Sequence, residues 1–299
     1  MIRIGPAGNA ESFTAMGYKS TPQIPEYLER MGLNAYEYQC GRGVRINREN
    51  VLKLREGCEQ RDIRLSLHAP YYISLSGVEE EKRLNSIKYI LESAEAADLM
   101  GATRIISMSR HADRQRIARE FGAKISREEA LSLAKDTMKR ALAALDEAHL
   151  GHIIVCPEVM GKFNQLGTLE EVLALCRLDD RLLPCIDFGH LNARTLGSIR
   201  GAEDYERILL TMKNEIGEQR MKCFHSHFSQ IEYTENGGEK RHLTFADTTY
   251  GPYFAPLAEV LVKYDCEPTI ICESAGTQAE DAVVMRDLYN QAAERKKQA

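Results

Sequence analysis

The chain has no excess of positive charge and no apolar run long enough to span a membrane. Its 39 lysines and arginines stand against 44 aspartates and glutamates, so no basic field over the whole surface indicates a nucleic-acid partner. The overall charge does not exclude a local basic groove. A membrane span needs roughly 20 apolar residues, and the N-terminus lacks the basic and then apolar layout of a signal peptide. We therefore expect a cytoplasmic protein with no membrane partner, and no protein partner is implied.

Two familiar motifs are also missing. The eight cysteines form no CxxC pair, and several stand inside apolar runs, where a thiol packs as a small apolar side chain. We predict reduced core cysteines and no disulfide framework. No GxGxxG follows the first β-rich run, and no shift in composition marks a second domain. These absences weigh against a doubly wound nucleotide-binding sheet and favour one domain over residues 1–299.

Short β-rich runs alternate with stretches of helical spacing along the whole chain. The runs begin at Ile2, Ala35, Arg64, Thr103, Ile153, Leu183, Lys222 and Thr269. The clearest helical stretches cover 79–101, 126–148 and 202–217, and several open with a cap residue or an acidic first turn. Eight strands over this length predict a single (β/α)8 barrel, an α/β fold, with an open doubly wound sheet as the alternative.

Metal-ligand residue types close several of these runs, at the C-terminal strand ends where barrels carry their functional groups. They are His68, Glu158, Asp187, His225 and Glu273. A lone acid at a strand end is more often a helix cap or an ion-pair partner, but four such residues in successive strands favour a site. Because a buried carboxylate needs a compensating cation, we predict that Glu158, Asp187, His225 and Glu273 bind one divalent ion. Zn²⁺, Mn²⁺, Mg²⁺ and Co²⁺ all suit this set.

The chain resembles the endonuclease IV branch of the xylose isomerase-like barrels, the family-2 apurinic/apyrimidinic endonucleases. The resemblance runs over most of the chain. It rests on LHAPYYISL with His68, CPEVMG with Glu158, IDFGH with Asp187 and His190, FHSHFS with His225, RHLTF with His242, YGPYFAPLAEVL, and ICES with Glu273. It implies a barrel with up to three zinc ions that grip a phosphate and activate water to cut DNA at an abasic site.

The resemblance also implies ligand roles. Glu158 would bridge two ions. Asp187, His225 and Glu273 would complete the coordination of one of these ions, and His68 would be a ligand of the other. His190 and His242 would belong to a third ion.

Two positions depart from the family pattern. Met108 stands where the family carries a histidine at the end of the fourth strand, and a thioether is a poor zinc ligand in an oxygen-rich site. Lys240 stands where the family carries an aspartate. Glu239 is a candidate replacement for that aspartate, and whether His111 or His227 takes over a lost ligand role stays open.

The resemblance points to substrate-binding residues as well. Tyr71 and Tyr72 follow His68, in a loop that endonuclease IV-like proteins insert into the DNA minor groove around a flipped-out nucleotide. Arg42 begins a basic cluster suited to phosphates, and His227 is a further candidate for substrate contact. The alternative interpretation of Tyr71 and Tyr72 is that they pack on a neighbouring helix at the rim of the barrel. The alternative interpretation of Arg42 is that it lies in a solvated surface loop.

Three functions are therefore open. Sugar isomerases and epimerases of the same superfamily use the four-residue set with one ion, and there Glu158 and Glu273 would exchange protons with the substrate carbon. We rank hydrolysis of abasic-site DNA first, because His68, His190 and His242 are retained. A one-metal sugar isomerase or epimerase comes second, and a catalytically inactive metal-binding barrel third.

Overall fold

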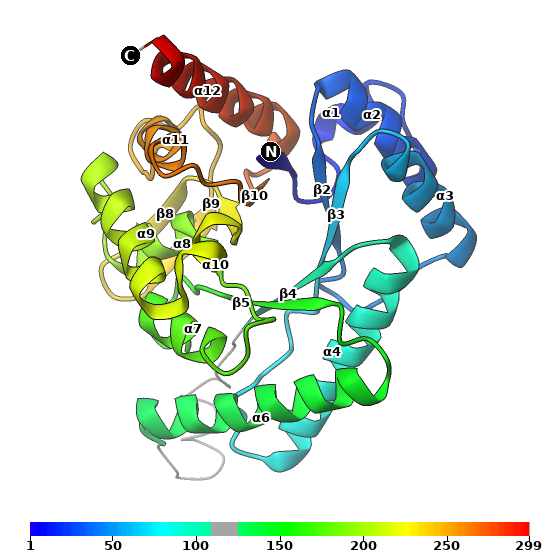
Figure 1. Cartoon of the computed structure of the whole chain (residues 1–299), viewed down its shortest axis with the longest axis vertical. Helices are drawn as coiled ribbons and strands as arrows, with labels where there is room; N and C mark the ends of the chain where they lie inside the picture. Colours follow the sequence, from blue (N-terminus) through cyan, green and yellow to red (C-terminus); the bar gives the residue numbers. More distant parts are fainter. Residues whose placement is uncertain (109–124, 299) are drawn as a thin grey trace.

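The structure is a computed structural model that describes residues 1–108 and 125–298. Its central feature is a barrel of parallel strands (Figure 1). The strands are β1 (Arg3–Pro6), β2 (Ala35–Gln39), β3 (Arg64–His68), β4 (Arg104–Met108), β5 (Ile154–Glu158), β6 (Cys185–Asp187), β7 (His225–Phe228) and β10 (Thr269–Cys272). They pair in the order β1-β10-β7-β6-β5-β4-β3-β2, and a parallel bridge from Ala7 to Glu37 joins the two ends of the sheet. The predicted barrel is confirmed.

Helices surround the strands (Figure 1). They are α1 (Glu11–Ala15), α2 (Ile24–Met31), α3 (Arg48–Glu59), α4 (Glu80–Met100), α6 (Arg127–Glu147), α7 (Leu169–Cys176), α8 (Phe188–Arg194), α9 (Ala202–Ile216), α10 (Glu218–Lys222), α11 (Phe254–Lys263) and α12 (Gln278–Gln298), with a 3-10 turn at Thr21–Gln23. The three expected helices are α4, α6 and α9. Their ends are sharp because the sequence caps them: Ser126 and Glu129 form a reciprocal capping box on α6, and α4 ends at left-handed Gly101.

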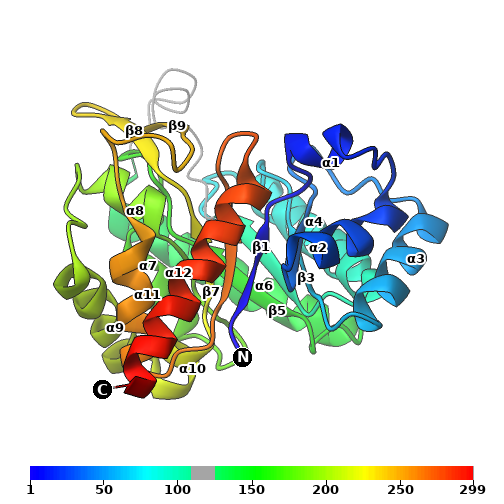
Figure 2. The ribbon, with the colours of Figure 1, turned by 90° about the horizontal axis from the view of Figure 1, so that it is seen from above.

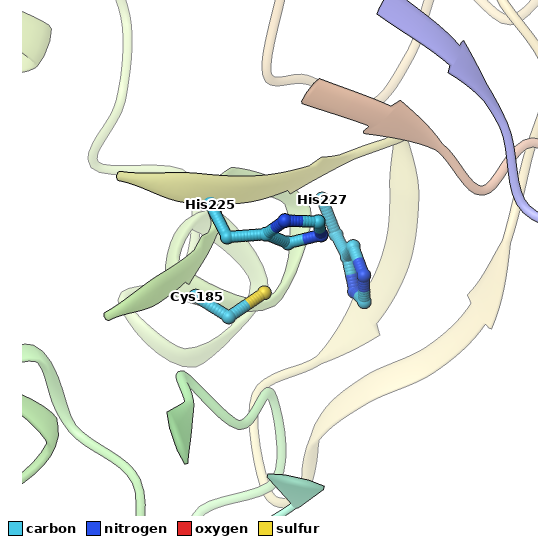
Figure 3. Close-up of side chains that lie close together, drawn as sticks. All are labelled: Cys185, His225 and His227. Carbon is cyan, nitrogen blue, oxygen red and sulfur yellow. The ribbon is translucent and has the colours of Figure 1, made fainter. Parts of the chain in front are cut away.

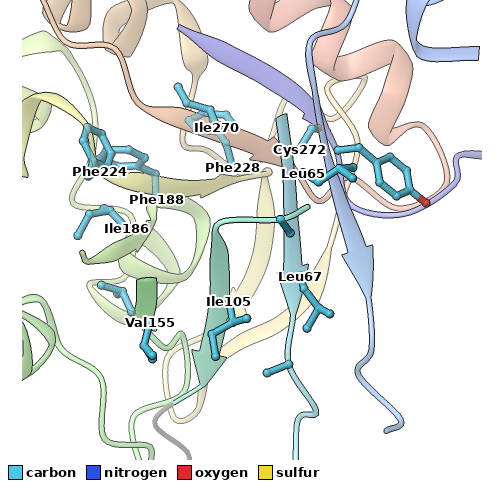
Figure 4. Close-up of a cluster of buried hydrophobic side chains, with 14 of the residues drawn as sticks. Leu65, Leu67, Ile105, Val155, Ile186, Phe188, Phe224, Phe228, Ile270 and Cys272 are labelled. Carbon is cyan, nitrogen blue, oxygen red and sulfur yellow. The ribbon is translucent and has the colours of Figure 1, made fainter. Parts of the chain in front are cut away.

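The apolar core lies mainly between the strands and the helices. Figure 4 shows Leu65, Leu67, Ile105, Val155 and Ile186 among the buried side chains of this layer. Because successive residues of a strand face opposite sides, the neighbours of these residues face into the barrel. There Ile106, Cys156, Leu183 and Cys185 form a second, small apolar cluster. The inward-facing positions nearer the C-terminal strand ends carry polar side chains, and this end is called the barrel mouth below.

An antiparallel hairpin, β8 (Ile231–Thr234) and β9 (Gly238–His242), follows β7 and was not predicted. Figure 2 shows it at the end of the barrel opposite the N-terminus. The backbone NH of Glu239 donates to the carbonyl of Gly161 at 3.2 Å, so the hairpin lies against the loop that follows β5. It therefore brings its own side chains to the barrel mouth.

Three further expectations can be compared with the described residues. None of their helices is long and apolar enough to cross a membrane. All eight cysteines lie in the described ranges, and each is free. Met108 ends β4 with its Cα paired to that of Glu158, but its side chain, like the whole of His111, lies outside what the structure describes.

Candidate metal centre

Four ligand-type side chains from the last four barrel strands meet at the barrel mouth. They are Glu158, Asp187, His227 and Glu273, called the inner group below, and their ligand atoms lie within 4.8 Å of one another. Glu158 ends β5, Asp187 ends β6, and Glu273 directly follows β10. Glu158, Asp187 and His227 are at most 1% exposed. Three carboxylates and one imidazole from four separate strands thus converge on one buried position.

The sequence analysis placed His225 in this group, and the structure places His227 there instead. Both imidazoles face the barrel interior, because residues two apart on a strand share a side (Figure 3). The pairing of β6 with β7 sets Asp187 opposite His227, whereas His225 pairs with Cys185 one step deeper. Nδ1 of His227 therefore lies 3.0 Å from Oε1 of Glu158, and His225 lies below the inner group.

The inner group fits a divalent cation. Among the described residues, Oε2 of Glu158 and Oδ2 of Asp187 are buried without a hydrogen-bond partner. The other Asp187 oxygen is used, because Oδ1 accepts the backbone NH of His190 at 2.7 Å and caps α8. Oδ2 of Asp187 has an ion-pair contact, 3.1 Å from Nδ1 of His190, but no hydrogen bond. Burying a carboxylate oxygen without a hydrogen bond is costly, and a metal ion is the partner that would satisfy both oxygens at once.

The charges of the inner group are strongly coupled. Burial raises the pKa of Glu158, but the charge of His227 and a hydrogen bond from it outweigh burial and lower the pKa to about 2. Burial also raises the pKa of Asp187. Burial lowers the pKa of His227, yet the surrounding anionic groups, Glu273 among them, hold it well above its ordinary value. A proton on His227 and a metal ion therefore compete for the same carboxylates.

A second cluster, called the outer group below, stands beside the first. It consists of His190, Glu239 and His242, again with ligand atoms within 4.8 Å of one another. Nε2 of His190 lies 3.6 Å from Oε2 of Glu239. The hairpin turns Lys240 away, toward an ion pair with Glu232. Glu239 thus belongs to the outer group, and the ammonium of the adjacent Lys240 points away from it.

Three histidines of the mouth are held in the orientation that metal-binding imidazoles usually have. Nδ1 of His68 contacts the carbonyl of Ala69 at 2.8 Å, and Nδ1 of His190 contacts the carbonyl of Val159 at 3.0 Å. Nδ1 of His242 bonds the hydroxyl of Ser229 at 2.8 Å. In each ring Nε2 is left to act as the ligand atom. Nε2 of His68 faces Oε2 of Glu158 at 3.9 Å, so His68 can supplement the inner group.

The matches to known proteins agree with this architecture. The family described as xylose isomerase-like TIM barrels matches residues 25–292. The chain belongs to this family. An uncharacterized protein of Methanocaldococcus jannaschii is 33% identical over 266 residues, which is 89% of this chain and 90% of the relative.

Two solved structures are similar to this xylose isomerase-like barrel in fold. One is 3-keto-D-glucoside 4-epimerase from E. coli, with a TM-score of 0.66 and 17% identity, covering 98% of this chain and 100% of the epimerase. The other is endonuclease IV from Thermus thermophilus, with a TM-score of 0.61 and 16% identity, covering 92% of this chain and 94% of the endonuclease. At such identities the similarity shows the fold alone.

Three of the four predicted substrate-contact residues of this xylose isomerase-like barrel lie in two touching loops. The backbone NH of Tyr71 donates to the carbonyl of Gly41 at 3.0 Å, which joins the loop after β3 to the loop after β2. Tyr71 and Tyr72 are 46% and 40% exposed, and their rings lie 5.7 Å apart. Arg42 is exposed beside them. Aromatic and basic groups thus share one side of the barrel mouth, whereas His227 is buried in the inner group.

Glu37 is a further ligand-type residue in the second β-rich run that was left out of the predicted site, and the structure places it inside the barrel. Its side chain is fully buried. Burial raises the pKa of Glu37, but the charge of His227 and hydrogen bonds from His225 and His227 outweigh it and hold the pKa well below the ordinary value. The signal was present in the sequence, because a carboxylate inside the strand Ala35–Gln39 needs a buried partner.

Proposed function

We propose that this protein is a metal-dependent phosphodiester hydrolase that cuts DNA at abasic sites. One observation carries the proposal: the outer group stands beside a complete inner group. A one-metal isomerase has no use for a second set of ligands, whereas phosphodiester hydrolysis gains from ions that hold the attacking and leaving oxygens. A single domain over residues 1–299, and work in the cytoplasm without a membrane partner, belong to the same proposal.

The charge of the centre supports more than one ion. Among the described residues, five carboxylates surround the two groups: Glu37, Glu158, Asp187, Glu239 and Glu273. A histidine that binds a metal ion is neutral, so His227 and His190 do not balance these carboxylates once ions are bound. The five carboxylates carry more negative charge than one divalent ion neutralises. We propose zinc, because the outer group and His68 supply imidazole ligands.

The residues divide the work as follows. Glu158, Asp187, His227 and Glu273 would hold one ion, and His190, Glu239 and His242 another. Bound there, divalent ions would neutralise a phosphate and lower the pKa of coordinated water. Glu273 is the most exposed carboxylate of the inner group, at 15% for its side chain, so it can reach substrate and accept a proton. Glu158 lies 3.6 Å from Nδ1 of His190 and so connects the two groups.

The two loops beside the mouth would hold the DNA. Tyr71 and Tyr72 present ring faces on which an unstacked base or the sugar next to an abasic site can pack. Arg42 supplies a phosphate contact. The net charge of −5 makes such a local basic patch necessary for any DNA complex, because the rest of the surface repels the backbone.

The test is cleavage of a duplex with one abasic site by protein loaded with zinc. An undamaged duplex of the same sequence is the matched substrate, and Asp187→Asn the matched protein. We expect cuts at the abasic position alone, loss of cleavage on chelation, and none with the variant. Absence of cleavage with zinc, manganese, magnesium or cobalt would contradict the proposal.

A second candidate is a sugar isomerase or epimerase that uses one divalent ion. It is favoured by the inner group alone, in which Glu158 and Glu273 belong to different strands and could face two sides of a bound carbonyl substrate. The measured ion count separates the candidates: one manganese or cobalt per chain with ketose epimerisation supports the isomerase. A protein that acts on neither substrate, whatever metal it binds, would be the inactive barrel.

A further inference from the structure

Glu37 is held in place by three neighbours on the floor of the metal centre, one of which is Gln39, whose Nε2 donates to Oε1 of Glu37 at 3.3 Å. The hydroxyl of Ser66 donates to Oε2 of Glu37 at 2.9 Å, and Nε2 of His225 lies 3.0 Å from the same oxygen. Both contacts are fully inside the barrel, where Glu37 and His225 have no exposed surface. The carboxylate is therefore fixed in rotation and cannot reach substrate.

The other oxygen of this carboxylate faces the metal centre. Oε1 of Glu37 lies 2.9 Å from Nε2 of His227 in an ion pair. On the far side of the same ring, Nδ1 of His227 lies 3.0 Å from Glu158 and 3.5 Å from Glu273. His227 thus stands between an anchored carboxylate below and the inner group above.

We propose that Glu37 is a positioning residue of the metal centre: it holds the proton of His227 on Nε2 and directs the lone pair of Nδ1 at the ion. A carboxylate behind a metal-binding histidine fixes the tautomer, orients the ring and makes the imidazole a stronger ligand. The inference deepens the proposed function and rests on its inner metal ion, but not on its substrate.

His225 completes this arrangement. His225 contacts Oε2 of Glu37, whereas His227 contacts Oε1, which also accepts a hydrogen bond from Nε2 of Gln39 at 3.3 Å, so the two histidines of the HSH segment take different oxygens of one carboxylate. In this proposal His225, which was predicted to be a metal ligand, instead helps to orient the ligand His227 through Glu37.

The test is metal binding by calorimetry with zinc, repeated with cobalt to record its absorption spectrum. Glu37→Gln keeps the size of the side chain and removes the charge. We expect binding weaker by about 10- to 100-fold, the usual loss for such outer partners, with an unchanged number of ions and an altered cobalt spectrum. Glu37→Asp keeps the charge but withdraws the oxygen from His227, so we expect it to bind weakly as well.

The matched control is Glu171→Gln. Glu171 is also a buried carboxylate, but it caps α7 and pairs with Arg127. We expect this variant to lose stability and to bind metal as the parent does. If Glu37→Gln does not fold, Ser66→Ala loosens the same carboxylate and is expected to weaken binding several-fold.

Two results would overturn the inference. One is unchanged affinity in the folded Glu37 or Ser66 variants. The other is the loss of one ion per chain in Glu37→Gln, which would make Glu37 itself a ligand together with His68, His227 and Glu273, whose ligand atoms lie within 4.8 Å of its own. Because every readout is metal binding, a failure to cut abasic DNA would leave this test unaffected.

Discussion

Nε2 of His190 lies 3.6 Å from Oε2 of Glu239, although His190 belongs to α8, directly after β6, and Glu239 belongs to the β8–β9 hairpin. This relationship adds a second group of ligands to the inner group. In the proposed function this second group binds a further ion, and that supplies the first test.

Glu239→Gln is expected to lower the number of bound ions by one, because it removes the carboxylate of the outer group. The adjacent Lys240→Gln is the matched control. Its ammonium pairs with Glu232 on the outside of the hairpin, so this variant should keep every ion. The number of ions per chain is measured by mass spectrometry after dialysis. Equal numbers in both variants would show that the outer group does not bind an ion.

Asp187→Asn is expected to abolish metal retention by the inner group and to reduce cleavage by more than about 100-fold, beyond the usual loss for an outer partner. The fold should survive, because an asparagine oxygen can still accept the backbone NH that caps α8. Glu158→Gln should behave in the same way. Circular dichroism together with metal content checks this. A variant that keeps both metal and turnover would show that the inner group is misassigned.

Met108→His is expected to raise the number of ions or their affinity. The register of β4 with β5 sets Met108 opposite Glu158, so a histidine there would return the ligand that the family pattern carries. Zinc titration of the parent and the variant makes the comparison. An unchanged count and affinity would mean that this strand end does not face the centre.

Tyr72→Ala and Arg42→Ala are expected to weaken binding of abasic DNA without changing the metal content. The tyrosine change removes a stacking surface worth about 1–3 kcal/mol. The arginine change should reduce the salt dependence of binding by about one phosphate contact. Arg295→Ala, an exposed arginine in the last turn of α12, is the control. Fluorescence anisotropy at several salt concentrations measures both effects, and equal losses in all three variants would contradict a DNA surface at these loops.

Strand alternation and helix caps made much of the fold predictable. They could not set the depth of a residue within the barrel. His225 and His227 share one face of β7, so their spacing alone could not decide which imidazole reaches the level of Asp187. That depended on the pairing with β6. Which of the two binds metal stays a prediction.

The hairpin was missed for a different reason. Its second strand reads Gly-Glu-Lys-Arg-His and has no apolar alternation, because it packs over a loop and not in the core. The position of Glu239 beside His190 therefore required the three-dimensional structure. Glu37 could be identified in its strand, but apart from Gln39 its partners come from β3 and β7, which local sequence does not connect.

The central claim is that more than one ion takes part in cutting a phosphodiester. The most direct measurement is cleavage of an abasic duplex by metal-stripped protein as zinc is added in measured equivalents. We expect no cleavage until the first equivalent is exceeded, and full activity once the inner and outer groups are both filled. Full activity at a single equivalent, or no cleavage at any zinc level, would contradict it.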